Sequence, residues 1–183
     1  MPNELKKWRR RPLLSPLLFP LGAMVALVAI AVWLFDARTT TVIIAVNGAE
    51  MELPAGASGD ANLSVSGKER AARLARMLAQ AHAVDAVFAM ETRRAQQTVL
   101  PLAEALGLSV NVIAQGAWGD FSKRIRREFS GRTVVVAGGS ETLPALVAAV
   151  SDDAVTVADT AYDRLYVIFA PRLSRPRVVQ LNY

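Results

Sequence analysis

The chain carries few residues that can perform covalent chemistry. It has no cysteine and a single histidine, His82, so thiol nucleophiles and disulfides are excluded and no metal site is expected. Ser140, in AGGSET, has no histidine or lysine beside it to act as a base, so capping of the following helix is its expected role. His82 lies at the end of a predicted helix and is interpreted as a surface or helix-capping residue.

The end of the first predicted strand is a candidate location for a functional site. The apolar run TVIIAV (41–46) leads into Asn47-Gly48, a common arrangement at active sites of α/β proteins. Neither residue supplies a nucleophile, a base or a charge. Any function at this strand end must therefore depend on what the rest of the fold brings there.

Composition excludes a disordered chain, and the distribution of charge argues against a nucleic-acid-binding protein. At 52% hydrophobic residues the chain is too apolar to be disordered. The sequence pI of about 10.1 suggests nucleic-acid binding, but residues 1–38 hold +4 of the total charge of +5. Residues 39–183 are therefore nearly neutral, and no nucleic-acid partner is expected.

The basic N-terminus precedes an uncharged apolar run, Leu13 to Phe35, of 23 residues. This length is sufficient for a transmembrane signal-anchor helix, and Pro16 and Pro20 near its start are compatible with one. The basic cluster at 6–11 predicts by the positive-inside rule that residues 1–12 are cytoplasmic. The domain is then expected on the periplasmic (extracytoplasmic) side of the inner (plasma) membrane.

Two alternatives for this run stay open. A cleaved signal peptide would need a small-residue site, and Ala29-Ile30-Ala31 lies inside the apolar run rather than after it. A buried core helix is the less favoured alternative, because the run is apolar on all faces and is flanked by a basic cluster. We therefore favour an uncleaved anchor, followed by a linker at 36–40 and a domain at 41–183.

The domain alternates strand and helix patterns. Ala71, Leu74 and Leu78, for example, recur at helical spacing. Predicted helices cover 66–82, 92–107, 120–130 and 141–150, and predicted strands cover 41–46, 84–89, 109–113, 133–138, 164–170 and 177–183. This alternation predicts an α/β fold, a three-layer αβα sandwich with a mostly parallel sheet. The strand ends Asn47-Gly48, Met90-Glu91 and Gly138–Ser140 should then meet at one edge.

Three segments together resemble a known family. They are IIAVNGAE (43–50) followed by LSVSGKERA (63–71), then VFAMETRRAQQT (87–98), then VVVAGGSETLPALV (134–147). Their order and spacing resemble the histidine phosphatase superfamily, which includes phosphoglycerate mutases and phosphohistidine phosphatases. The resemblance covers about residues 41–170 and implies the fold of that family.

The family's reactive residues are absent from the matching positions. The family's first strand ends in Arg-His-Gly or Arg-His-Ala-Glu, and its fourth ends in Gly-His-Ser/Gly. Asn47 stands where the family has a phosphate-binding arginine, and Gly48 and Gly139 stand where it has its two catalytic histidines. Arg94 keeps a phosphate-binding position. Scaffold positions are kept by Leu63, Gly67, Gln97, Thr98, Thr142 and Pro144.

The resemblance therefore implies a domain that has lost catalysis. In this family a histidine attacks phosphorus and carries the phosphoryl group, and cations stabilise the charged oxygens. Glycine has no side chain with which to attack. No catalytic residue is assigned, and no cofactor is expected.

Binding is the activity expected to survive. Arg94, Asn47 and Ser140 are the candidate ligands for a phosphate or another anion, which Glu91 and Glu141 would weaken. Equally, Arg94 is explained by a structural ion pair or by inheritance of the fold. The expected partners are thus the membrane and a phosphate-like ligand or a protein. The alternatives are an active phosphohydrolase with an unrecognised nucleophile and a purely structural interaction module.

A basic segment, SKRIRREF (122–129), fits none of these motifs. It has one apolar face and one cationic face. Contact with anionic lipid or a partner is one interpretation, and a solvated surface helix is the commoner one.

Overall fold

The computed structural model describes residues 15–48, 60–81, 83–151 and 163–183. The chain divides into two compact units, Met1–Phe35 and Asp36–Tyr183. Among the described residues, one helix is long and apolar enough to cross a membrane, judged by length and composition alone. This helix, α1, runs from Ser15 to Thr39 with Pro20 inside it. Residues 36–39, predicted as part of a linker, thus continue the helix.

The second unit is built on a six-stranded sheet with the strand order β3-β2-β4-β1-β5-β6. Strands β1 to β4 are mutually parallel, whereas β5 runs antiparallel to β1 and β6 antiparallel to β5. The predicted mostly parallel sheet is therefore confirmed. The strands are β1 (Thr41–Asn47), β2 (Ala86–Met90), β3 (Val110–Ile113), β4 (Thr133–Gly138), β5 (Arg164–Ala170) and β6 (Arg177–Asn182).

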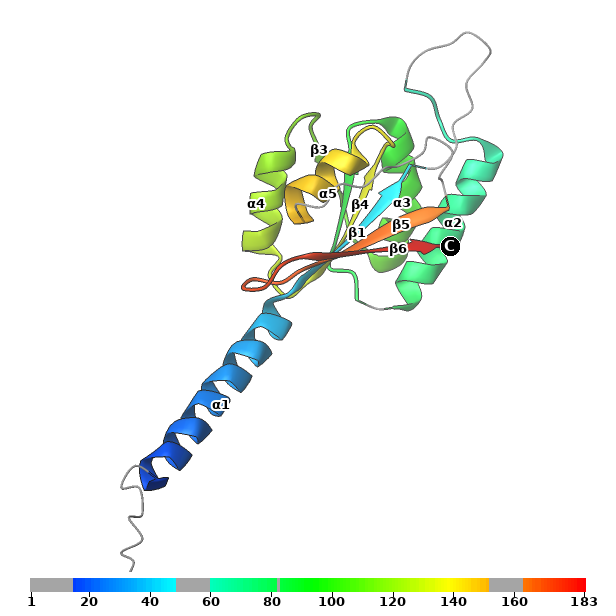
Figure 1. Cartoon of the computed structure of the whole chain (residues 1–183). Helices are drawn as coiled ribbons and strands as arrows, with labels where there is room; N and C mark the ends of the chain where they lie inside the picture. The colour runs from blue at the N-terminus through cyan, green and yellow to red at the C-terminus, as the bar shows by residue number, and fades with distance from the viewer. Residues whose placement is uncertain (1–14, 49–59, 82, 152–162) are drawn as a thin grey trace, which may run out of the picture. The chain divides into compact units, whose positions relative to one another are not determined.

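Two pairs of helices cover opposite faces of this sheet (Figure 1). Helices α2 and α3 pack on each other, and α3 packs on β2, β3 and β4. Helices α4 and α5 pack together on the other face, where α5 contacts β1 and β5. The three-layer αβα fold is therefore confirmed. The helices are α2 (Val65–Gln80), α3 (Arg93–Leu106), α4 (Trp118–Glu128) and α5 (Leu143–Ser151).

Local sequence explains where the helices on one face begin and end. The Ser64 hydroxyl accepts a hydrogen bond from Gly67 N at the start of α2, and the Thr92 hydroxyl accepts one from Ala95 N at the start of α3. Gly107 ends α3 with φ of 66°, a left-handed conformation that glycine adopts without strain. These caps fix the register of α3, which carries Arg94.

The core lies on both faces of the central strands. Every residue of β2 is buried, and so is β4 after its first residue. Phe88 of β2 makes edge-to-face contacts with Phe121 and Phe129, with ring centroids 5.2 and 5.5 Å apart. This aromatic cluster fastens α4 to the sheet.

Candidate functional site

Three strand ends meet at one edge of the sheet, as the sequence predicted. Asn47 at the end of β1 pairs with Gly138 at the end of β4, and the next amide, Gly48 N, donates to Gly138 O at 2.7 Å. Ala89 of β2 pairs with Ala137, so Met90 also lies at this edge. The chain segments that matter in the resemblance are therefore adjacent in space.

Arg94 lies against both glycines. A Cβ atom added at Gly48 would lie 2.9 Å from Arg94 Cγ and 3.1 Å from its Nε. A Cβ atom added at Gly139 would lie 2.7 Å from Arg94 Nη2. The arginine side chain thus occupies the space beside Gly48 and beside Gly139. We call the group formed by Gly48, Arg94 and Gly139 the Arg94 site.

The first turn of α3 positions this arginine, and Arg94 itself is half-buried. Its backbone carbonyl accepts a hydrogen bond from the Thr98 hydroxyl at 2.7 Å. Among the residues that the structure describes, no carboxylate or other acceptor contacts its guanidinium. A structural ion pair within that part of the chain therefore does not account for Arg94.

A cavity of about 170 Å³ opens beside Arg94 and Gly139. Its lining contains one cation, Arg94, and two carboxylates, Glu91 and Glu141. Both glutamates are exposed, so water screens them better than it screens the half-buried guanidinium. The remaining lining residues are Met90, Thr92, Gln115 and Thr142.

Asn47 is at this sheet edge but does not line the cavity. It is fully buried, and neither its amide nitrogen nor its amide oxygen has a hydrogen-bond partner in the described structure. An orphaned buried amide costs about 1–3 kcal/mol per unsatisfied group. As an anion ligand Asn47 therefore remains a prediction, and the structure shows an amide turned into the interior.

Ser140 does not start a helix in the way the sequence suggested. Helix α5 begins at Leu143 rather than at 141, and the turn before it is closed by Thr142. The Thr142 hydroxyl accepts from Gly139 N at 2.8 Å, while Leu143 N donates to Gly139 O at 2.9 Å. Ser140 is buried and lies outside the cavity lining.

Sequence reasoning missed Gln115 and the part played by Thr142. Gln115 follows β3, whose carboxyl end lies at the same edge as that of β2, so its place in the strand order was the available signal. His82 and Glu50 lie outside the described residues. No group of three or more metal-ligating side chains occurs in the part of the chain that the structure covers.

Arg94 presents its guanidinium to a cavity whose described lining includes no histidine. A guanidinium presents planar donors that match the oxygens of phosphate or carboxylate. No hydroxyl–imidazole or hydroxyl–lysine pair occurs among the described cavity-lining residues.

The chain is similar to known proteins in part of its sequence and in its fold. Residues 49–116, which include Arg94, match the family described as histidine phosphatase superfamily (branch 1). No curated protein sequence matches the chain.

Among solved structures, the protein histidine phosphatase SixA in complex with tungstate is similar, with 17% sequence identity and a TM-score of 0.62 over 77% of this chain and 96% of that one. A mycobacterial glucosyl-3-phosphoglycerate phosphatase is similar at 16% identity and a TM-score of 0.56, over 78% of this chain and 99% of that one. The putative phosphohistidine phosphatase SixA of Agrobacterium tumefaciens is 15% identical with a TM-score of 0.54, over 80% and 99% of the two chains. These likenesses show the fold. The family match over residues 49–116 and the shared fold agree with the resemblance read from the motifs.

Proposed function

We propose that this chain is a membrane-anchored domain of histidine phosphatase fold that binds an anionic or phosphorylated ligand at Arg94 without turning it over. One observation carries this proposal. A half-buried guanidinium without a described acceptor lies against two glycines that stand where the family has catalytic histidines.

The loss of chemistry follows from the two glycines. Phosphoryl transfer through a histidine needs a ring nitrogen in line with phosphorus, and Gly48 provides none. The two glycines also leave Arg94 as the one cation that lines the cavity in the described structure. Binding without a nucleophile gives a stable complex rather than a phosphoenzyme.

A tetrahedral oxyanion is the ligand that this arrangement supports best. The solved SixA structure is a tungstate complex, and tungstate, vanadate and phosphate are all tetrahedral oxyanions. By analogy, such an ion would occupy the cavity of about 170 Å³ and accept hydrogen bonds from Arg94. The exposed Glu91 and Glu141 oppose it electrostatically, so affinity should rise as ionic strength increases their screening.

The direct test is stabilisation of the full chain in detergent by orthovanadate. A ligand present at 100 times its Kd stabilises by about 2.7 kcal/mol, which for a domain of this size raises Tm by about 5–10 °C. Arg94→Gln should abolish the shift. Arg93→Gln is the matched control because Arg93 is the preceding residue of α3 and does not line the cavity. An equal shift in Arg94→Gln would refute the assignment.

The membrane part of the proposal has its own test. We propose that α1 anchors the chain in the inner membrane with residues 1–12 cytoplasmic and residues 41–183 outside the cytoplasm, since the basic cluster precedes the apolar run. Protease added to intact spheroplasts should digest the domain. Protection of the domain until the membrane is broken would contradict this orientation.

A further inference from the structure

A second cavity, of about 380 Å³, lies within the Asp36–Tyr183 unit at the far end of β1 from the Arg94 site. It borders Thr41, the first residue of β1, whereas the Arg94 site adjoins the last. Seven strand residues at about 3.3 Å each separate the two sites by about 20 Å. The second cavity is therefore distinct from the site at which this family does its chemistry.

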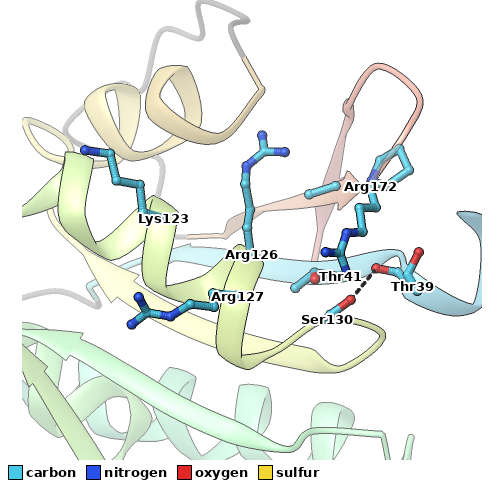
Figure 2. Close-up of a pocket in the computed structure, with 9 residues that line it drawn as sticks. Thr39, Thr41, Lys123, Arg126, Arg127, Ser130 and Arg172 are labelled. Carbon is cyan, nitrogen blue, oxygen red and sulfur yellow. Dashed lines mark hydrogen bonds between the residues drawn. The ribbon is translucent and has the colours of Figure 1, made fainter.

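Cations dominate its lining, and we call it the basic pocket. Lys123, Arg126 and Arg127 come from α4, and Arg172 comes from the turn between β5 and β6 (Figure 2). No carboxylate is among the described lining residues. The positive potential of this lining favours an anion that enters the pocket.

Most of these cations have no ion pair with a described carboxylate, so their charge is available to a bound anion. Arg127 forms an ion pair with Glu128 at 2.9 Å, and its side chain points away from Arg126 in Figure 2. Arg126 donates to the backbone carbonyl of Val150, which leaves its charge uncompensated. No described carboxylate lies within ion-pair distance of Lys123, Arg126 or Arg172.

The walls of the basic pocket are hydrogen-bonded to the end of α1. Ser130 Oγ donates to Thr39 O at 3.3 Å (Figure 2). Gly131 N donates to the same oxygen at 3.2 Å. Gly131 has φ of 72°, and a Cβ atom there would lie 2.4 Å from Arg38 O, so only glycine allows this contact.

The β5–β6 turn, which forms the other wall of the basic pocket, is also hydrogen-bonded to α1. The Asp36 carboxylate accepts hydrogen bonds from Leu173 N, at 2.7 Å, and from the Ser174 hydroxyl. Both residues directly follow Arg172 in the β5–β6 turn. Asp36 and Thr39, two of the four residues of α1 that come after the apolar run, are thus hydrogen-bonded to the two loops that border the basic pocket.

The place of the basic pocket along the chain favours one class of anion, a lipid headgroup. Thr39 lines the basic pocket and lies only four residues after Phe35, the last residue of the apolar run. In a chain anchored by that run, Thr39 lies at the level of the lipid headgroups. We propose that the basic pocket binds the phosphodiester headgroup of an anionic phospholipid from the bilayer in which α1 is anchored. This inference rests on the proposed membrane anchor.

The test compares two lipids on the full chain in detergent. Native mass spectrometry should show a bound phosphatidylglycerol in preference to phosphatidylcholine with the same acyl chains. Each basic residue near a membrane surface contributes about fivefold to anionic lipid binding. Arg172→Gln, on an exposed turn, should therefore reduce the preference about fivefold, and adding Arg126→Gln should reduce it about 25-fold.

Arg124→Gln is the matched control, because Arg124 is on α4 but is paired with Glu128 at 2.9 Å and does not line the basic pocket. It should keep the preference. Neutralising Arg9, Arg10 and Arg11 together tests the N-terminal basic cluster as the rival headgroup site and should also leave the preference largely intact. A preference that depends on those three arginines and is unchanged in Arg172→Gln would overturn the inference.

Two further measurements complete the test. The first distinguishes a lipid headgroup from a soluble anion, and the second tests the membrane anchor separately from the headgroup site. Inorganic phosphate at millimolar concentration should not displace the lipid, and displacement at that concentration would identify a soluble anion instead. Flotation of the chain with membranes after alkaline extraction tests the anchor alone. A chain that floats but shows no lipid preference overturns the headgroup site and leaves the anchor standing.

Discussion

A methyl group added at Gly48 probes the packing of the Arg94 site directly. The new Cβ would lie 2.9 Å from Arg94 Cγ, 3.1 Å from Nε and 3.3 Å from Cδ. These atoms belong to the middle of the side chain, so Arg94 must change rotamer along most of its length. Overpacking of this kind costs about 1–3 kcal/mol, against about 0.4–1 kcal/mol gained from a less flexible unfolded chain. We expect Gly48→Ala to lower the free energy of unfolding by about 1 kcal/mol.

Arg94→Ala removes all three contacted atoms, so the cost should disappear in that background. The same Gly48→Ala change should then be neutral or stabilising, with a coupling energy of about 1–2 kcal/mol between the two positions. Thermal unfolding of the full chain in detergent measures this coupling. The change in Tm caused by Gly48→Ala should differ by about 3 °C between the wild-type and Arg94→Ala backgrounds.

Gly119→Ala supplies the control, because nothing lies within 4 Å of a Cβ atom added there and the residue is in helix α4. It should stabilise by up to about 1 kcal/mol through helix propensity. If Gly48→Ala had the same effect with and without Arg94, then Arg94 would not fill the space beside Gly48, and the described geometry of the site would be wrong.

Three more outcomes are expected. Asn47→Leu should raise the free energy of unfolding by about 1–3 kcal/mol, measured by thermal unfolding, because it removes two buried amide atoms that have no described partner. Phe88→Ala should lower it by about 3–5 kcal/mol, since Phe88 is 1% exposed and holds α4 on the sheet. The hydrogen bond from Arg124, with a further one from Arg127, lowers the pKa of Glu128 below its ordinary value, so NMR titration should find a lower midpoint that Arg124→Gln raises. Because this pKa is lower in the folded state, the stabilisation is present above the unfolded pKa of about 4.3 and is lost as pH falls through the folded value.

Matched control variants show whether these changes in stability come from the stated contacts or from substitution of that residue type anywhere in the chain. Asn111→Leu should not stabilise, because the Asn111 amide already donates to Val87 O at 3.1 Å. Phe169→Ala should cost far less than Phe88→Ala, since Phe169 is 41% exposed. A stabilising Asn111→Leu, a tolerated Phe88→Ala or an unshifted Glu128 midpoint would each contradict the corresponding explanation.

Local patterns were sufficient to predict the elements of the fold. The β-branched runs at 133–138 and 164–170 coincide with β4 and β5, and Gly107 marks the end of α3 as expected. The meeting of three strand ends followed from the rule that parallel strands share one carboxyl edge. The end of α1 did not follow from hydrophobicity, because the helix continues to Thr39, four residues past the apolar run, where Asp36 accepts a hydrogen bond from Leu173 N.

The candidate site was predictable as a location but not as a geometry. Its position came from motif order, which placed Gly48, Arg94 and Gly139 together. The conformation of Arg94 across both glycines is a property of side-chain packing, which no spacing encodes. The basic pocket was predictable only in part. The sequence singled out its α4 cations at 122–129, but Arg172 joins them from 45 residues after Arg127, through the antiparallel return of β5.

The central claim is that a phosphatase fold here binds without catalysing, and hydrolysis of p-nitrophenyl phosphate by the purified full chain tests it most directly. The absence of a nucleophile at Gly48 predicts no turnover above the detergent blank, and the same value for Arg94→Gln. Turnover by the wild-type chain that Arg94→Gln abolishes would contradict the claim, because it would show that Arg94 serves an active phosphohydrolase.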